Sequence, residues 1–162
     1  MRLPKRILVA TDFSDTASAA FDYAVELAKQ LGAKVTAVHA YELPVYGFPN
    51  GALVASVEMT TRIMSAAQEA LESACKARAN RGVEITPLVR QGVTWEEVHR
   101  VAEEMDADLI VIGTHGRKGL SRALLGSVAE KIIRTATRPV LTIHGSHEPA
   151  AKTETKAAQP SA

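Results

Sequence analysis

The sequence has few of the features on which secreted, membrane-spanning and polyanion-binding proteins depend. It contains one cysteine, Cys75, so no disulfide can form within the chain and a disulfide-stabilised secreted domain is excluded. No stretch approaches 18 consecutive apolar residues, so we expect no transmembrane helix. The formal net charge of +1 gives no support for a nucleic-acid-binding protein, which usually has a strong basic excess. Any basic patch must therefore be local.

The N-terminal segment does not resemble a signal peptide. Its apolar run covers residues 7–10 and meets Thr11 and Asp12 before a hydrophobic region of sufficient length could form. We therefore expect a cytoplasmic protein. The length of 162 residues suits one domain over residues 1–145. Residues 146–162 are rich in Ala, Lys, Thr, Glu and Pro without apolar periodicity, which predicts a disordered tail.

Short apolar runs alternate along the chain with amphipathic segments. The runs predict strands over residues 5–10, 35–40, 83–89, 108–113 and 139–143. The amphipathic segments predict helices over residues 14–31, 53–79, 94–105 and 127–136, whereas residues 42–51 hold two prolines and two glycines and predict an irregular loop. This alternation is typical of an α/β fold, an open parallel sheet with helices on both faces. Pro87 predicts that the third strand lies at or near an edge.

Several residues predict where the helices begin and end. Ser14 is expected to cap the first helix, and Gly32 to end it. Residues 94–97 read Thr-Trp-Glu-Glu, a capping box that predicts the start of the third helix at Thr94. Residues 127–130, Ser-Val-Ala-Glu, form the same pattern at the last helix.

Two strand ends have unusual chemistry, and ligands of open parallel sheets bind at the carboxyl ends of strands. Thr11 and Asp12 follow the first strand, and a glycine-rich loop over residues 113–127 follows the fourth. Glycine lets the backbone approach a ligand, and the N-terminus of the following helix attracts anions. The residues of this loop that could serve a ligand include the glycines Gly113, Gly116 and Gly126, the cations Arg117, Lys118 and Arg122, and the hydroxyl of Ser127.

Two better-known phosphate loops are absent. Neither G-x-x-x-x-G-K-[ST] nor G-x-G-x-x-G occurs anywhere in the chain. From the residues alone, two interpretations of the loop stay open. It either binds a phosphate group or is a plain connection in which Ser127 only caps the last helix.

The loop pattern Gly113-x2-Gly116-x9-Gly126-Ser127 resembles the nucleotide-binding signature of the universal stress protein family, in its ATP-binding branch. The resemblance spans residues 5–144. It includes the opening Ile-Leu-Val-Ala-Thr-Asp-Phe-Ser at residues 7–14, Val-His-Ala at 38–40 and the closing Arg-Pro-Val-Leu at 138–141. It implies a single-domain, Rossmann-like fold of the adenine nucleotide alpha hydrolase type, with a five-stranded parallel sheet in the order 3-2-1-4-5. It further implies a role in stress responses and a homodimer formed through the strand Pro139–Ile143.

The resemblance also implies a set of nucleotide-binding residues. Ala10, Thr11 and Asp12 would line the adenine and ribose side, Ala40 would touch the adenine, and Gly113 would contact the ribose. Six residues would surround the phosphates, namely Thr114, His115, Gly116, Gly126, Ser127 and Val128, with Arg117 adding positive charge. Family members often have proline where this chain has Ala10, and a small side chain there still permits close approach.

Asp12 has two possible roles. It could contact a ligand or hold Mg²⁺ or Mn²⁺ together with the phosphates, or it could form an Asx turn that leads into the first helix. Among the histidines, His115 could donate to a phosphate oxygen or simply be exposed, and His39 is expected to be a hydrogen-bonded core residue. The five histidines show no spacing typical of a structural zinc site.

Three functions remain possible from the sequence. The first is a nucleotide-dependent regulator rather than an enzyme, and the second is a slow ATP hydrolase or phosphotransferase. The third is an interaction domain that binds another small molecule. Because the phosphate loop is mostly backbone chemistry, the residues do not distinguish ATP from ADP, AMP or a cyclic nucleotide.

Overall fold

The computed structural model describes residues 3–43, 45–48, 51–54, 56–114 and 125–144. Five strands form a parallel sheet in the order β5-β2-β1-β6-β7. Their bounds are Arg6–Ala10 for β1, Lys34–Tyr41 for β2, Ile85–Gln91 for β5, Leu109–Gly113 for β6 and Val140–Ile143 for β7. Counted along the chain within this sheet, the order is 3-2-1-4-5. The predicted α/β fold and strand order are therefore confirmed, including the edge position of the strand that contains Pro87.

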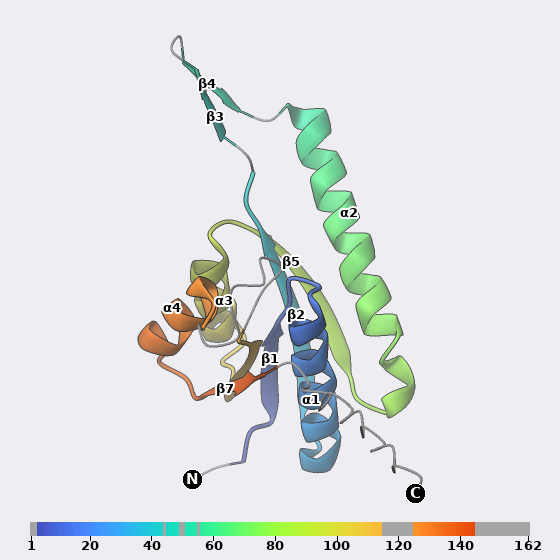
Figure 1. Cartoon of the computed structure of the whole chain (residues 1–162). Helices are drawn as coiled ribbons and strands as arrows, with labels where there is room; N and C mark the ends of the chain where they lie inside the picture. Colours follow the sequence, from blue (N-terminus) through green and yellow to red (C-terminus); the bar gives the residue numbers. More distant parts are fainter. Residues whose placement is uncertain (1–2, 44, 49–50, 55, 115–124, 145–162) are drawn as a thin grey trace, which may run out of the picture.

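Two pairs of helices cover the two faces of the sheet (Figure 1). The first pair is α1, Asp15–Leu31, and α2, Val57–Lys76, followed by a short 3-10 turn, η1, Ala79–Arg81. The second pair is α3, Thr94–Glu104, and α4, Ser127–Thr135. Alternate side chains of β1 point to opposite faces. Ile7 and Val9 pack with α1 and α2, whereas Leu8 packs with α3 and α4.

Helix α1 begins and ends where its sequence predicts. The Ser14 hydroxyl accepts a hydrogen bond from the backbone N–H of Ala17 at 3.2 Å, and Gly32 ends the helix with a left-handed φ of 60°. One stripe of the helix is buried against the sheet and contains Ala17, Ala20, Phe21, Ala24, Val25 and Ala28. Small residues dominate this stripe, so the helix can pack close to the sheet.

The segment that the sequence analysis assigned to a loop contains an antiparallel hairpin, and that prediction is wrong. Strand β3, Val45–Phe48, pairs with β4, Gly51–Val54, and Leu53 lies opposite Tyr46. The glycines and prolines of this segment indicated a loop, but its β-branched and aromatic residues favour strands, and in the structure the strands form. The predicted start of the second helix near Leu53 is wrong for the same reason. The helix begins at Val57, where Ser56 accepts a hydrogen bond from the N–H of Met59.

Neither predicted capping box forms. In α3 the N-cap is Val93 and in α4 it is Gly126, so Thr94 and Ser127 are the first helical residues and neither N-cap makes a side-chain hydrogen bond. The N-cap of each helix lies one residue before the predicted one, because the carbonyls of Val93 and Gly126 already accept the first helical hydrogen bonds, at 3.0 and 2.8 Å. The interpretation of Ser127 as only a cap is therefore wrong.

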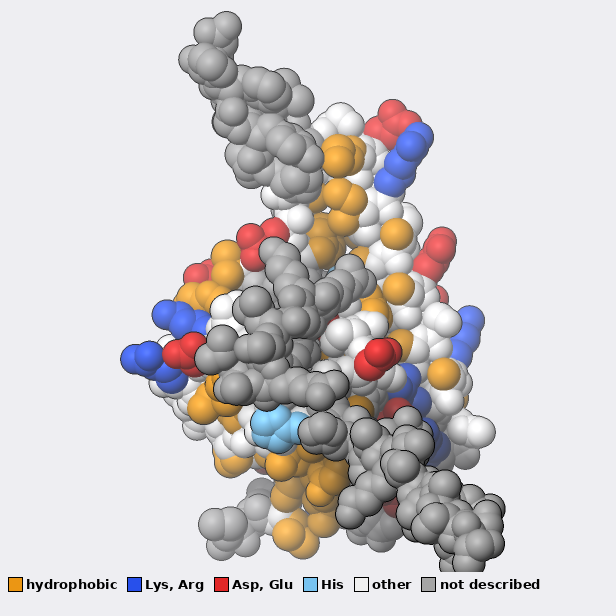
Figure 2. All heavy atoms as spheres, viewed as in Figure 1, with side chains coloured by type: hydrophobic (Ala, Val, Ile, Leu, Met, Phe, Trp, Pro, Cys, Tyr) orange, Lys and Arg blue, Asp and Glu red, His pale blue; other side chains and the backbone are white. Residues whose placement is uncertain are grey.

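Helix α2 extends beyond the sheet at its N-terminal end. Its buried residues, Ala67, Leu71 and Cys75, all lie in the C-terminal half. Near its start, Val57 is 85% exposed, and Figure 2 shows hydrophobic side chains on the visible surface of this helix. Among the residues that the structure describes, none belongs to a helix with the length and hydropathy needed to cross a membrane.

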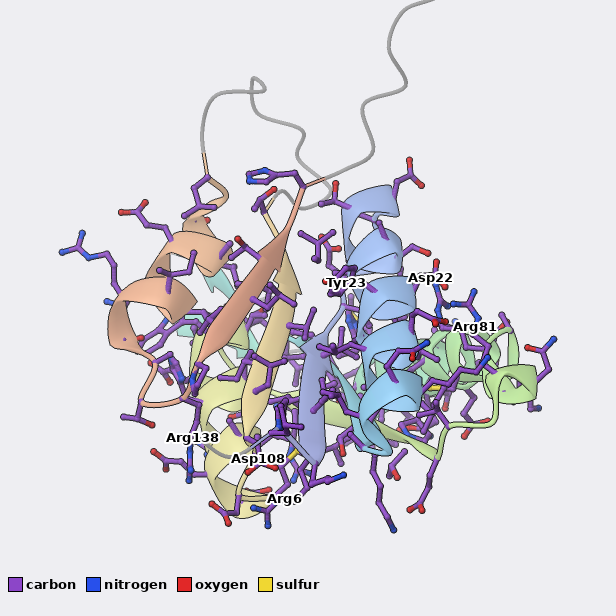
Figure 3. All side chains as sticks on the ribbon, turned by 90° about the horizontal axis from the view of Figure 1, so that it is seen from below. Arg6, Asp22, Tyr23, Arg81, Asp108 and Arg138 are labelled. Carbon is purple, nitrogen blue, oxygen red and sulfur yellow. The ribbon has the colours of Figure 1, made fainter. Side chains whose placement is uncertain are left out.

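Polar contacts tie distant segments together at two places. At the amino end of the sheet, an Asp108 carboxylate oxygen accepts from the backbone N–H groups of Lys5 and Arg6, both at 2.9 Å. These bonds lower the pKa of Asp108, with the Lys5 N–H making the largest contribution. Figure 3 shows Arg6, Asp108 and Arg138 gathered there. At the second place, the buried Arg78 joins the end of α2 to α1.

Candidate functional site

The turn between β1 and α1 holds Thr11 and Asp12 at the carboxyl edge of the sheet. Thr11 is buried; its N–H donates to the Val38 carbonyl at 2.9 Å, and its hydroxyl accepts from the N–H of Phe13 at 3.1 Å. Oδ1 of Asp12 accepts from the N–H of Ser14 at 3.0 Å, which is an Asx turn. The structural role considered for Asp12 is thus present, and it engages one carboxylate oxygen.

The same turn holds a non-glycine residue in a left-handed conformation. Phe13 has a φ of 65°, and its ring lies 4.5 Å from that of His39, centroid to centroid. Nδ1 of His39 donates to the Thr11 carbonyl at 2.8 Å, because a carbonyl can only accept. His39 is therefore the hydrogen-bonded residue that the sequence predicts. A left-handed non-glycine residue costs on the order of 1–3 kcal/mol and persists where surrounding contacts hold it, often at ligand sites.

The end of β6 is packed tightly against the start of α1. A Cβ added to Gly113 would lie 3.0 Å from the backbone and side chain of Thr16 and 3.1 Å from the nitrogen of Ala17. Glycine at this position is therefore needed for packing, apart from any contact with a ribose. Because β1 and β6 are neighbours, paired from Ile7↔Leu109 to Val9↔Val111, this end also lies beside Thr11 and Asp12.

Thr114 joins the two ends of the glycine-rich loop. It is buried, its N–H donates to the Ile143 carbonyl at 3.0 Å, and its carbonyl accepts from the N–H of Gly126 at 2.8 Å. The chain leaving β6 and the chain entering α4 are thus in direct contact. The predicted phosphate residues His115, Gly116 and Arg117 lie between these ends, outside the described residues, as do Lys118 and Arg122.

The N-terminus of α4 opens at this junction. Ser127 and Val128 are exposed, and the N-cap residue Gly126 provides no side-chain acceptor for the backbone N–H groups of the first turn. These N–H groups, together with the positive end of the helix dipole, favour an anion. The structure therefore brings Thr114, Gly126, Ser127 and Val128 together, as the sequence predicts for a phosphate site.

An apolar strip lies beside the N-terminus of α4. Ala10 packs with the cluster beneath α3 and α4, and its register partner on β2 is Val38. Ala40 is two residues beyond Val38, so it lies on the same face of the sheet, at its carboxyl end. The ends of β2, β1 and β6 are consecutive in the sheet. The predicted adenine side and phosphate side are consequently neighbours, and they meet at β1.

Two polar residues at this edge were not predicted as site residues. His144 follows β7, and its Nδ1 lies 3.1 Å from the Thr114 hydroxyl. Glu97 is in the first turn of α3 and is 3% exposed. One feature of the sequence indicated its burial. Glu97 lies on the same helical stripe as the apolar residues Val98, Val101 and Ala102. The capping-box interpretation hid this signal, because it assigned the glutamate to the helix end.

No group of three or more His, Cys, Asp or Glu side chains within the described ranges is arranged to hold a metal ion. Cys75 is 8% exposed, as expected for a small core residue, and burial raises the pKa of its thiol. This part of the structure provides neither a preformed metal cluster nor an activated thiol. What the edge offers is hydrogen-bond donors for an anion and an apolar surface for a flat group.

Comparison with known proteins gives a consistent result. The model of the universal stress protein family matches residues 4–144. Universal stress protein MJ0531 of Methanocaldococcus jannaschii is 38% identical over 143 residues, which is 87% of this chain and 82% of that protein.

Solved structures are similar as well. The structure of MJ0577 is 26% identical with a TM-score of 0.73, covering 88% of this chain and 96% of that one. The universal stress protein from Archaeoglobus fulgidus in complex with dAMP is 27% identical with a TM-score of 0.60, covering 88% and 99% of the two chains.

Proposed function

We propose that this chain, which belongs to the universal stress protein family, binds an adenine nucleotide such as ATP and acts as a nucleotide-dependent regulator in the cytoplasmic stress response. The observation that most supports this proposal is the N-terminus of α4, whose first turn lacks a side-chain cap beside the buried Thr114. The relative from Archaeoglobus fulgidus in complex with dAMP supports an adenine nucleotide as the ligand.

In this proposal the nucleotide lies across the ends of β2, β1 and β6. Gly126, Ser127 and Val128 contact the phosphates, together with Thr114 and the loop residues His115, Gly116 and Arg117. Thr11, Asp12 and Gly113 line the ribose, and Ala10 and Ala40 contact the base. The members of this set that come from β1, β2 and β6 lie at or just after the carboxyl ends of these neighbouring strands, and Gly126 joins the start of α4 to them through the Thr114 carbonyl.

Asp12 would hold Mg²⁺ or Mn²⁺ that accompanies the phosphates. The hydrogen bond from the N–H of Ser14 to its Oδ1 holds the carboxylate at the end of β1. Mg²⁺ usually takes only one or two protein carboxylates and completes its coordination with phosphates and water. A single aspartate beside the phosphates therefore fits such an ion, whose charge would offset that of the phosphates.

A regulatory role agrees better with the described residues than rapid catalysis. Hydrolysis needs a group that activates or positions water at the γ-phosphate. The carboxylate nearest in sequence to the start of α4, Glu130, is exposed and lies 3.5 Å from Arg134. We therefore expect single-turnover formation of ADP with Mg²⁺ or Mn²⁺ to be slower than about 1 s⁻¹, the low end of ordinary enzymes. A faster rate would assign this chain to the enzymes.

We also propose that two copies associate through β7. This strand is the last in the sheet, and all four of its residues are only half-buried. An apolar edge strand with unpaired backbone groups is a template for another strand. The edge at β7 therefore favours a homodimer, in which a bound nucleotide could alter contacts with a protein partner.

The test places a negative charge where the phosphates are expected. Asp is favourable in the first turn of a helix, so Ser127→Asp should leave folding intact, yet it should repel a nucleotide phosphate. Ser56→Asp is a matched control, because it adds the same charge at the N-terminus of α2 while retaining a capping oxygen.

Calorimetric titration with Mg-ATP should show binding by the wild type and by Ser56→Asp. Ser127→Asp should bind at least about 100-fold more weakly, the loss of roughly 3 kcal/mol in a charge-assisted contact. Thermal unfolding should show the same fold stability for all three proteins. If Ser127→Asp binds Mg-ATP as tightly as the wild type, the phosphates do not lie at α4.

A further inference from the structure

Glu97 is a buried carboxylate with one unsatisfied oxygen. Its side chain is 4% exposed, and its Oε1 lies 2.9 Å from Nη1 of Arg100. Its Oε2 is buried and has no hydrogen-bond partner among the residues that the structure describes. Buried polar atoms are almost always hydrogen-bonded, and leaving one unsatisfied destabilises the fold. The Arg100 contact engages Oε1 and leaves Oε2 without a donor.

The Glu97 carboxylate lies near the end of β2, where the base is proposed to bind. A Cβ added to Gly92 would lie 2.7 Å from Oε1 of Glu97 and 3.1 Å from its Cδ, so the carboxylate lies directly under the turn from β5 to α3. The N–H of Gly92 donates to the Tyr41 carbonyl at 2.9 Å, which joins that turn to the end of β2. Tyr41 directly follows Ala40. Figure 1 shows this turn at the carboxyl end of the sheet, beside the end of β2.

Glu97 also lies on the same face of the sheet as the residues proposed to contact the base. Glu97 belongs to the buried stripe of α3, whose apolar members Val98, Val101 and Ala102 pack in the same cluster as Val38 of β2 and with Ala10. Ala40 lies on that face as well, because it is two residues beyond Val38. The unsatisfied oxygen and the two alanines proposed to contact the base are therefore on one side of the sheet, at the same edge.

We infer that Glu97 is a specificity-determining residue that accepts a hydrogen bond from the exocyclic 6-amino group of the bound adenine. The inference rests on the proposed function and specifies the base. An apolar strip holds any flat ring, but a buried acceptor without a donor selects a ring that carries an N–H at the matching position. Sites built to hydrogen-bond a group reject analogues that lack it, because a buried polar atom is then left unpaired.

The test compares Mg-ATP with the triphosphate of purine riboside, which has hydrogen in place of the 6-amino group. The wild type should bind Mg-ATP about 10- to 100-fold more tightly than the analogue, the effect of one hydrogen bond to a charged group. Glu97→Met keeps similar volume but removes the acceptor. Its preference should fall to within about 3-fold. Arg100→Ala is the matched control: it removes the partner of Oε1, leaves Oε2 in place, and should retain the full preference.

Thermal unfolding of the free proteins distinguishes recognition from a structural role. Replacing a buried, half-satisfied carboxylate with an apolar side chain of similar size is neutral or stabilising. Glu97→Met should therefore unfold at the same temperature as the wild type or a higher one. The inference is overturned if Glu97→Met keeps the wild-type preference, or if the wild type binds both triphosphates equally. If the wild type binds neither triphosphate, the proposed function fails, and the inference fails with it.

Discussion

Replacing Arg78 with alanine should destabilise the whole fold, although Arg78 lies far from the proposed site in the sequence. The side chain of Arg78 is 9% exposed, and its guanidinium group joins α2 to α1. Nε donates to Asp22 at 3.1 Å, Nη2 to the Ser18 hydroxyl at 2.8 Å, and Nη1 to the Ala74 carbonyl at 2.9 Å. The guanidinium carbon also lies 4.4 Å from the centre of the Phe21 ring.

The expected loss follows from the exposure of the two partners. Removing one member of a fully buried ion pair costs about 3–5 kcal/mol, because the other charge stays buried. Asp22 is 43% exposed and also contacts Arg81 at 2.9 Å, so water and Arg81 can compensate for much of the loss. The lost bonds to Ser18 and Ala74 and the lost packing on Phe21 remain. We therefore expect Arg78→Ala to lower the free energy of unfolding by about 2–3 kcal/mol.

Urea unfolding, monitored by circular dichroism, measures this change directly. For a chain of this size the same loss corresponds to a decrease of about 4–12 °C in the midpoint of thermal unfolding. Arg81→Ala is the matched control. It removes a cation from the same acceptor, but Arg81 is 37% exposed, so the expected loss is below about 1 kcal/mol. Equal losses for the two variants, or a loss under about 0.5 kcal/mol for Arg78→Ala, would refute this account of how α2 is held.

Two further predictions concern β7 and the amino end of the sheet. The carbonyls of Pro139 and Ile143 accept hydrogen bonds from β6, so the N–H of Thr142, which lies between them in the alternation, points to the free edge. Thr142→Pro removes this N–H and should convert the proposed dimer to a monomer in sedimentation experiments, while nucleotide binding persists. A dimer that survives this change would require another interface. The lowered pKa of Asp108 stabilises the fold above the unfolded value of about 3.9, and this contribution disappears as the pH falls through the lower folded value. In urea titrations, Asp108→Asn should therefore be less stable than the wild type at pH 7 and should lose less stability between pH 4 and pH 2. If the stability of the two proteins changes with pH in the same way, Asp108 does not make this contribution.

The strand and helix pattern was predictable because it depends on residues close together in the chain. Apolar runs and helical periodicity indicated the five sheet strands, and Ser14 and Gly32 indicated the ends of α1. Local signals failed where two of them competed. The glycines and prolines of residues 42–51 hid the hairpin. The helices at Thr94 and Ser127 begin where they were predicted, but the capping-box patterns gave the wrong N-caps, which are Val93 and Gly126.

By itself, the sequence determined the alternation of strands and helices and thereby the parallel sheet, and it determined which two strand ends have unusual chemistry. Only the tertiary structure decided which groups meet across that edge. It brought Thr114 to Gly126 and His144, and it buried Glu97 beneath Gly92 with one oxygen unsatisfied. The physical reason is that such contacts join residues on different elements, whose distances depend on how the helices pack on the sheet. Periodicity and propensity within one segment contain no information about those distances.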